Sequence, residues 1–535
     1  MATYSPCEQN YEKGNSNSLE ILPSELILNI FTHLKIKDLG RCAQVSKTIY
    51  AIAYDKTLWT KILVTSCMPP ERFVPPCGYA PPRIMPHGLL VQALSRGARY
   101  LGLSNLSFIS TSQPNFPPTN QVEYLALSGS FMNENYFRQL ILSCHNLKKL
   151  SLADPYGAWK SDHLMKGILQ NSNSLRVLDL SGCCKLKPQD VKSIMSSCLN
   201  LTEANFSYNV WDIQVPNLSV IYGNFTPNIT KLGLSGAVIG FNAITTLITR
   251  CNKLTDLDLT HARIIDEPEN NNIRFPTKMH LESLYMRGVD VQFTHLDMLI
   301  PSCENSLKVL DISYCEKMTL QAIQLIVSRC LYLTAVDFMD LKHAAFICKN
   351  LTTNIEKISL SNTDISNEDI KMLVSRCNKI KELDISHTKI VINEVVDEII
   401  LYLSSTLKKL SLPTTYSSRL SKINRCPLFK LGSMPKLKYL RSFVWSQTFM
   451  KRLMDLWGKK FPDVVLSCHD HFSCHNHCNY STQYCGPTIT PKPNIAKSMS
   501  VEETIWEIPC KGIELSELQE EDSEESKNDA SIRNF

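Results

Sequence analysis

Apolar residues recur along the middle of the chain in the pattern L-x-x-L-x-L. The fourteen starts of this pattern are separated by 22 to 30 residues. The clearest copies begin at Leu147, Leu175, Leu254, Leu307, Ile380 and Leu407, and weaker copies begin at Ala98, Val122, Leu201, Ile229, Leu281, Leu333, Ile355 and Leu437. A fixed period of this length predicts one supersecondary unit that is repeated along the chain.

Each unit consists of a predicted strand followed by a predicted helix. The strand turns its leucines inward, and a segment such as 243–251, AITTLITRC, returns the chain as a helix. Neither piece can bury its apolar face alone, so neighbouring units must stack. We therefore predict an α/β solenoid over residues 98–465, a leucine-rich-repeat horseshoe of the cysteine-containing type with about 14 repeats.

Cysteines stand at a fixed place in several units, at the end of the predicted helix. They are Cys144, Cys198, Cys251, Cys330 and Cys377. Because their position relative to the leucines is constant, we interpret them as small buried apolar groups rather than as redox or metal-binding residues.

Polar residues form two columns on the predicted inner face of the solenoid. One column contains Asp179, Asp258, Asp311, Asp337 and Asp384, with Ser151, Asn205, Ser359 and Ser411 between them, and the other contains Lys149, Lys231, Lys357 and Lys409. Catalysis by paired carboxylates is one reading, since like charges in a cleft raise a pKa. We favour solvated strand residues, because no histidine or nucleophile accompanies them. The acidic column should disfavour a phosphate at the middle of the arc.

A small helical module precedes the repeats, at residues 19–62. Leu26, Ile27, Ile30, Phe31 and Leu34 form one apolar stripe on a predicted helix that starts near Pro23. Two further short helices are expected. Some 40 residues make a thin core, and the apolar stripe exceeds what three short helices can cover. We expect this module to complete its core on a partner.

Composition narrows the class of protein. Apolar residues make up 44% and charged residues 20% of the 535 residues, which is ordinary for a folded protein. The net charge of +5 is too small to indicate nucleic-acid binding. The sequence shows no signal-peptide pattern and no apolar run long enough for a membrane span, so we expect no membrane contact. The twenty cysteines are then expected to be reduced thiols in the nucleus and cytoplasm.

Four other segments flank or separate these parts. Residues 1–18 are expected to be disordered, and 63–97 form a proline-rich segment that we interpret as a stiff spacer, with a flexible linker as the alternative. Residues 466–510 form a C-terminal tail with a Cys/His-rich insertion. Residues 511–535 are acidic and serine-rich and are predicted to be disordered, a solubilising tail in which Ser523 and Ser526 are candidate phosphoacceptors.

The helical module resembles an F-box, the segment by which substrate receptors join a Skp-family adaptor. The matching pattern is LP-x-E-L…IF-x-x-L…DL…VSK…A-x-D-x-x-LW, with Ile49 where the family usually has tryptophan. The resemblance implies that the adaptor is bound by Leu22, Pro23, Leu26, Ile30, Phe31, Leu34, Leu39, Val45, Lys47, Leu58 and Trp59.

The combination with leucine-rich repeats is similar to the S-phase kinase-associated protein 2 type of F-box proteins. Stretches 171–183, 196–207 and 249–259 and the tail segments FPDVVLSC and ETIWEIPC carry this likeness. It implies a non-catalytic receptor that brings phosphorylated cell-cycle proteins to cullin and RING subunits for ubiquitylation, with a Cks-type accessory protein. Substrate or accessory contacts are expected from Lys409, Tyr439, Arg441, Trp445 and Trp506, near the C-terminal end of the arc; buried aromatics of a capping repeat are the alternative.

The stretch LSCHDHFSCHNHCNYSTQYC raises the question of a metal site. Cys468, His471, Cys474 and Cys478 have spacings that occur in zinc sites. No second compact C-x-x-C pair follows, so we predict no cofactor and interpret the stretch as an elaborated loop. No catalytic motif is visible. The alternatives to a ligase receptor are a leucine-rich-repeat scaffold or inhibitor without a ligase role, and a zinc-dependent module.

Overall fold

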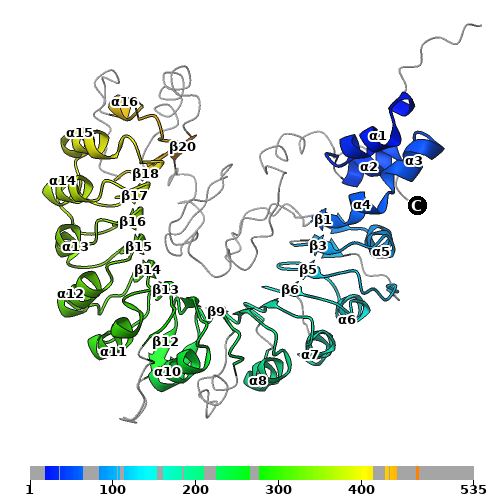
Figure 1. Ribbon diagram of the computed structural model, residues 1–535, viewed down its shortest axis with the longest axis horizontal. Coiled ribbons are helices and arrows are strands. Elements are labelled where there is room, and N and C mark those ends of the chain that lie inside the picture. The colour runs from blue at the N-terminus through cyan, green and yellow to red at the C-terminus, as the bar shows by residue number, and fades with distance from the viewer. Residues whose placement is uncertain are drawn as a thin grey trace, which may run out of the picture.

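A computed structural model of the chain defines the fold over most of its length. The described residues are 19–34, 36–63, 83–104, 106–108, 114–153, 161–183, 186–209, 225–265, 276, 278–413, 428–432, 434–442 and 465–468. They form a helical module and a long arc of strands and helices (Figure 1).

The inner side of the arc is one parallel sheet of sixteen strands among the described residues. Neighbouring strands in the sheet follow one another along the chain. The strands are β1 (Lys61–Leu63), β3 (Tyr100–Gly102), β5 (Tyr124–Ala126), β6 (Lys149–Ser151), β7 (Val177–Asp179), β8 (Glu203–Asn205), β9 (Lys231–Gly233), β11 (Asp256–Asp258), β13 (Ser283–Tyr285), β14 (Val309–Asp311), β15 (Ala335–Asp337), β16 (Lys357–Ser359), β17 (Glu382–Asp384), β18 (Lys409–Ser411), β19 (Tyr439–Ser442) and β20 (Val465–Cys468). Each of the fourteen predicted repeat starts is followed two residues later by one of these strands, so the solenoid is confirmed.

Helices line the outer side of the arc, as Figure 1 shows. They are α5 (His87–Ser95), α6 (Glu134–Ser143), α7 (Ser161–Gln170), α8 (Pro188–Ser197), α10 (Phe241–Arg250), α11 (Phe293–Cys303), α12 (Leu320–Arg329), α13 (Ala344–Asn350), α14 (Asn367–Arg376), α15 (Ile392–Leu403) and α16 (Leu428–Leu431). Two short parallel pairs, β2 (Arg83–Met85) with β4 (Leu106–Phe108) and β10 (Val238–Gly240) with β12 (Arg263–Ile265), complete the set. The leucines of the repeat pattern fill one continuous core between strands and helices.

The turn after most strands ends at a residue whose backbone has a positive φ, in the left-handed region. Positive φ occurs at Gly182, Tyr208, Gly236, His261, Gly288 and Tyr314, among others. Each turn donates a backbone N–H to the next repeat, as Gly288 does to the Ser313 carbonyl at 2.7 Å. Tyrosine or histidine therefore occupies a conformation that glycine adopts at lower cost. The rings cover the glycines of the following turns, and a Cβ on Gly288 would lie 2.5 Å from Nδ1 of His261.

The cysteines at the helix ends are buried, as predicted. Cys144, Cys198, Cys251, Cys330 and Cys377 are all free thiols inside the core. Burial raises the pKa of Cys144 to about 12, so its sulfur stays protonated and behaves as an apolar group.

The inner-face aspartates differ from our expectation of solvated residues. Asp179, Asp258, Asp311 and Asp337 are buried, and Asp384 is half-buried. Each carboxylate accepts a hydrogen bond from the backbone N–H two residues later, for example from Met339 to Asp337 at 3.0 Å. This is an Asx-type turn, so the column holds the strand-to-turn junctions in shape. Alternation of side chains along the strand is insufficient to predict this burial, because the turn folds back over the carboxylate.

The helical module consists of η1 (Leu19–Ile21), α1 (Ser24–Phe31), α2 (Ile36–Cys42), α3 (Lys47–Ala53) and α4 (Lys56–Trp59). Its own core is small and contains Ile27, Phe31, Leu39, Ala43, Ile49, Ile52 and Ala53. The Ser46 side chain caps α3 by accepting from the Ile49 N–H at 3.2 Å. Ile49, the departure from the family pattern, lies inside this core.

The module is joined directly to the solenoid, which differs from the predicted spacer at 63–97. Only Thr60 separates α4 from strand β1, which pairs with β3 of the first repeat. Trp59 belongs to the solenoid core and donates from Nε1 to the Ala53 carbonyl at 3.0 Å. The Arg96 guanidinium lies 3.7 Å from the ring centre of Tyr54. The predicted spacer interval itself contains β2 and α5.

None of the helices in the described ranges is long and apolar enough to cross a membrane.

Candidate functional site

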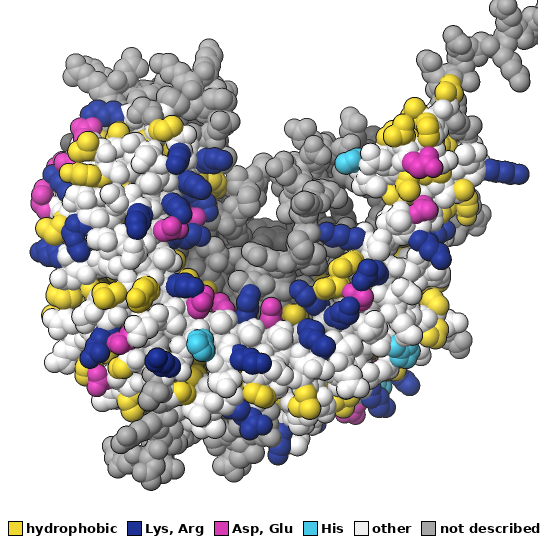
Figure 2. All heavy atoms as spheres, in the orientation of Figure 1, with side chains coloured by type: hydrophobic (Ala, Val, Ile, Leu, Met, Phe, Trp, Pro, Cys, Tyr) yellow, Lys and Arg dark blue, Asp and Glu magenta, His cyan; other side chains and the backbone are white. Residues whose placement is uncertain are grey.

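Helix α1 carries apolar side chains on two faces. Ile27 and Phe31 point into the module and are buried. Leu26 and Ile30 lie four residues apart, so they share a second face of the helix, and Leu26 is 51% exposed. Leu22, just before the helix, is exposed as well. Figure 2 shows hydrophobic side chains gathered over this module. An exposed apolar row on so small a module indicates a surface that a protein partner covers.

The residues that the F-box resemblance assigns to adaptor binding divide into two groups. Leu22, Pro23, Leu26, Ile30, Val45 and Lys47 are exposed, and Val45 is 75% exposed. Phe31, Leu39 and Trp59 are buried, whereas Leu34 and Leu58 are half-buried against the core. The exposed group forms what we call the α1 surface. Phe31 and Leu39 belong to the core of the helical module, whereas Trp59 belongs to the solenoid core. Ile21 and Tyr50, exposed apolar residues outside our set, are further candidates.

A second surface lies on the inner rim of the arc, near its C-terminal end. We call it the lysine patch, and it consists of Lys357, Lys381, Lys408, Lys409, Lys436 and Lys438. Figure 2 shows Lys and Arg side chains gathered on this part of the rim. Strand register places Lys357, Glu382, Lys409 and Tyr439 side by side on β16 to β19. Backbone hydrogen bonds align a second row, in which Lys438 donates to Lys408 and Lys408 to Lys381.

Two glutamates neutralise part of the lysine patch. Glu382 lies between two lysines, with its Oε1 3.2 Å from Nζ of Lys409 and 3.5 Å from Nζ of Lys357. Glu356 pairs with Lys381 at 2.7 Å. Lys408, Lys436 and Lys438 are exposed, and within the described part of the chain they form no ion pair. The patch therefore keeps an excess of positive charge that favours an anionic partner.

The predicted substrate contacts lie partly on this patch. Lys409 and Tyr439 are neighbours on β18 and β19, and the backbone of Arg441 continues β19. The side chain of Arg441 and all of Trp445 and Trp506 lie outside the described residues. Lys408 and Lys438, which the sequence analysis did not select, precede Lys409 and Tyr439 in the repeat, and the recurrence of lysine at that place was the available signal.

The zinc question concerns residues that the structure mostly does not describe. The backbone of Cys468 lies in β20, whereas its side chain and residues His471, Cys474 and Cys478 lie outside the described ranges. In those ranges, no group of three or more His, Cys, Asp or Glu residues could hold a metal ion.

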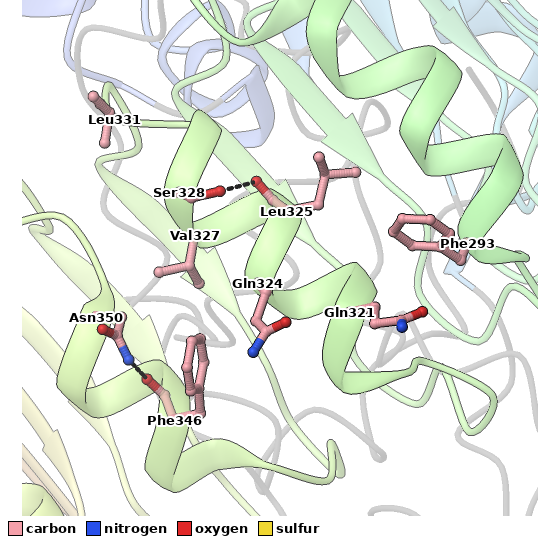
Figure 3. A pocket seen from close by; sticks show the side chains of 9 residues that line it. All are labelled: Phe293, Gln321, Gln324, Leu325, Val327, Ser328, Leu331, Phe346 and Asn350. Atoms are coloured by element: carbon pink, nitrogen blue, oxygen red, sulfur yellow. Dashed lines mark hydrogen bonds between the residues drawn. The ribbon is translucent and has the colours of Figure 1, made fainter.

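A cavity of about 720 Å³ opens on the outer side of the arc, between α11, α12 and α13. Figure 3 shows its lining, in which Gln324 and Leu325 of α12 lie between Phe293 and Phe346. The repeat from β15 to β16 is short, and α13 has only 7 residues, so the row of helices is indented here. No charged side chain lines this cavity. It therefore offers no selectivity for an anion, in contrast to the lysine patch.

Two protein-family models match the chain. Residues 19–65 match the F-box-like family, and residues 88–285 match the SKP2 LRR domain. Over these residues the chain is thus similar to an F-box followed by leucine-rich repeats of the SKP2 type, as predicted. Receptor families of this kind are non-catalytic.

Individual relatives match this chain either over a short region or at low sequence identity. F-box/WD repeat-containing protein 8 from Homo sapiens is 58% identical over 41 residues, and that of Rattus norvegicus 54%; the match covers 8% of this chain and 7% of each relative. An internalin from Listeria monocytogenes covers 67% of this chain and 87% of its own at 12% identity, with a TM-score of 0.33. A TLR13–ssRNA13 complex covers 64% of this chain and 50% of its own at 17% identity, with a TM-score of 0.36.

Proposed function

From a chain that joins an F-box to leucine-rich repeats of the SKP2 type, we propose a receptor that binds a Skp-family adaptor through its α1 surface and degradation substrates through its repeats. The adaptor in turn recruits cullin and RING subunits. The observation that carries this proposal is the exposed apolar face formed by Leu26 and Ile30 of α1, with Leu22 exposed just before the helix. A module with a core of only seven buried apolar residues gains from covering that face.

The substrate side of the proposal rests on the lysine patch. Its exposed and unneutralised lysines favour a substrate segment that carries phosphate or several carboxylates. Phosphorylated cell-cycle proteins, a Cks-type accessory protein and a location in nucleus and cytoplasm are the finer parts of this proposal, and they follow from the family likeness.

Binding to a purified Skp-family adaptor tests the proposal. Leu26→Asp places a charge in the α1 surface, and we expect it to weaken adaptor binding by at least about 30-fold, since central apolar contacts dominate such interfaces. Leu401→Asp is the matched control, because Leu401 is 70% exposed on α15, at the other end of the arc. Full-length chain that fails to bind the adaptor would exclude the ligase role and favour the alternative, a leucine-rich-repeat scaffold or inhibitor.

A further inference from the structure

The lysine patch holds more positive charge than its own glutamates neutralise. Six lysines face two glutamates, which leaves four positive charges. Lys408, Lys436 and Lys438 carry most of this excess, because they are exposed and form no ion pair with any residue that the structure describes. Ammonium groups held this close together repel one another, so an anionic segment that covers them removes an unfavourable interaction.

The patch is a row rather than a pocket. Lys381, Lys408 and Lys438 lie at equivalent places just before the consecutive strands β17, β18 and β19, and neighbouring strands are about 4.8 Å apart. Two cavities in the described part of the chain lie elsewhere, on α11–α13 and beside Met279. Such a surface suits several anionic groups spread along a segment better than one enclosed phosphate.

The chain itself contains such a segment. Residues 514–525, ELSELQEEDSEE, carry seven carboxylates in twelve residues and no lysine or arginine. We propose that this acidic segment docks on the lysine patch of the same chain and competes there with an acidic or phosphorylated substrate segment. The competition rests on the proposed function, whereas the docking does not.

The course of the chain allows this contact. Strand β20 pairs with β19, so the chain leaves the last described strand two strands away from Lys408 and Lys409. Forty-five residues separate Cys468 from Glu514, and an extended chain of that length spans up to about 150 Å. Because the segment is tethered beside the patch, its effective concentration there is high, and modest affinity is sufficient for docking.

Charge pairing at an exposed surface makes the docking sensitive to salt. Single surface pairs are weak, so the contact depends on many of them together. At about 1 M salt the screening length falls to about 3 Å, and the segment should then leave the patch. A substrate segment with more phosphates or carboxylates should displace it in the same way, so the segment sets a threshold for substrate binding.

Carbodiimide cross-linking of the full chain, read by mass spectrometry, tests the docking. Carbodiimide joins lysines directly to carboxylates that touch them. We expect cross-links from residues 514–525 to Lys408, Lys436 or Lys438, and their loss at about 1 M salt. The Lys408→Glu/Lys438→Glu variant should lose them, whereas Lys166→Glu on α7 should keep them. Cross-links spread evenly over exposed lysines, including Lys166, or no cross-link from this segment, would overturn the proposal.

Binding of a labelled octaglutamate peptide tests the competition. A full-length variant with all seven carboxylates of 514–525 replaced by Gln or Asn should bind the peptide roughly 2- to 10-fold more tightly than the natural chain. Equal affinities would overturn the competition. Neither experiment involves the adaptor. A negative result in either one would therefore not contradict the proposed adaptor binding by the α1 surface, and a failure of adaptor binding would not contradict the docking.

Discussion

At the scale of single residues, polar side chains on the inner face serve the fold. Asp311 and Asp337 are adjacent on β14 and β15, and both are buried. Burial raises the pKa of both carboxyl groups, and the Asp311 charge raises that of Asp337 further. Arg287 offsets part of this effect. These residues stabilise turns through their backbone hydrogen bonds, at the cost of desolvating a carboxyl group.

Asp337→Asn should relieve that cost. The pKa of Asp337 is raised to about 8, so the folded chain holds a proton that the unfolded chain releases above about pH 4. The folded state binds more protons between these values, and its stability therefore falls as pH rises from about 4 to about 8. The asparagine keeps an oxygen for the Met339 N–H. We expect the variant to be more stable by about 1–3 kcal/mol at pH 8 and the gain to shrink toward pH 4 in thermal unfolding.

Asp364→Asn, at an exposed position, is the control for this pH series and should change little. If Asp337→Asn is no more stable than the natural chain at pH 8, that result would contradict a buried Asp337 carboxyl group with a raised pKa.

Gly288→Ala should destabilise the turn after β13. Its φ of +64° disfavours any Cβ, and the added carbon would meet the His261 ring. We expect a loss of roughly 1–3 kcal/mol in denaturant unfolding. Adding His261→Ala should recover the steric part and leave the backbone part. Full recovery, or no loss in the single variant, would show that the turn is not held as described.

At the scale of elements, the repeat units were predictable and the junctions were not. The leucine period located the repeats that hold fourteen of the strands, because strand leucines cannot face water in any stack of repeats. It did not locate β1, since LWTKIL has only part of the pattern. The prolines of 63–97 suggested a spacer, yet Trp59 and β1 already join the module to the first repeat. Contacts between elements distant in sequence leave no periodic signal.

Trp59→Ala should loosen this junction. It removes a buried ring from the solenoid core and its hydrogen bond to Ala53, and we expect a loss of about 3–5 kcal/mol. Since repeat units contact only their neighbours, the effect should stay local. Hydrogen exchange should accelerate in α3, α4 and α5 and remain unchanged in β14 to β17. Acceleration throughout the arc, or none near α4, would contradict a local junction.

At the scale of the whole molecule, the two surfaces lie at opposite ends of the arc (Figure 1). The exposed face of α1 followed from the sequence, since one helix held more apolar residues than its module could bury. The lysine patch was predicted only in part from the sequence, because Lys409 was selected and its neighbours Lys408 and Lys438 were not. Strand register brings them together, and this register is set by pairing between neighbouring repeats rather than by the pattern within one repeat.

Removing charge from the far end should leave adaptor binding unchanged. Lys408→Glu/Lys438→Glu alters exposed side chains near β18 and β19, so binding of a Skp-family adaptor to the α1 surface should match that of the natural chain. Loss of adaptor binding in this variant would show that the two surfaces are not independent.

The central claim is that one chain couples capture at the lysine patch to degradation through the α1 surface. Quantitative affinity capture from cells, with and without proteasome inhibition, tests it most directly. The natural chain should capture a set of proteins only under inhibition. The Leu26→Asp variant should capture the same proteins without inhibition, and the Lys408→Glu/Lys438→Glu variant should fail to capture them. Captured proteins whose amounts respond neither to inhibition nor to Leu26→Asp would contradict this coupling. That result would favour the alternative, a leucine-rich-repeat scaffold without a ligase role.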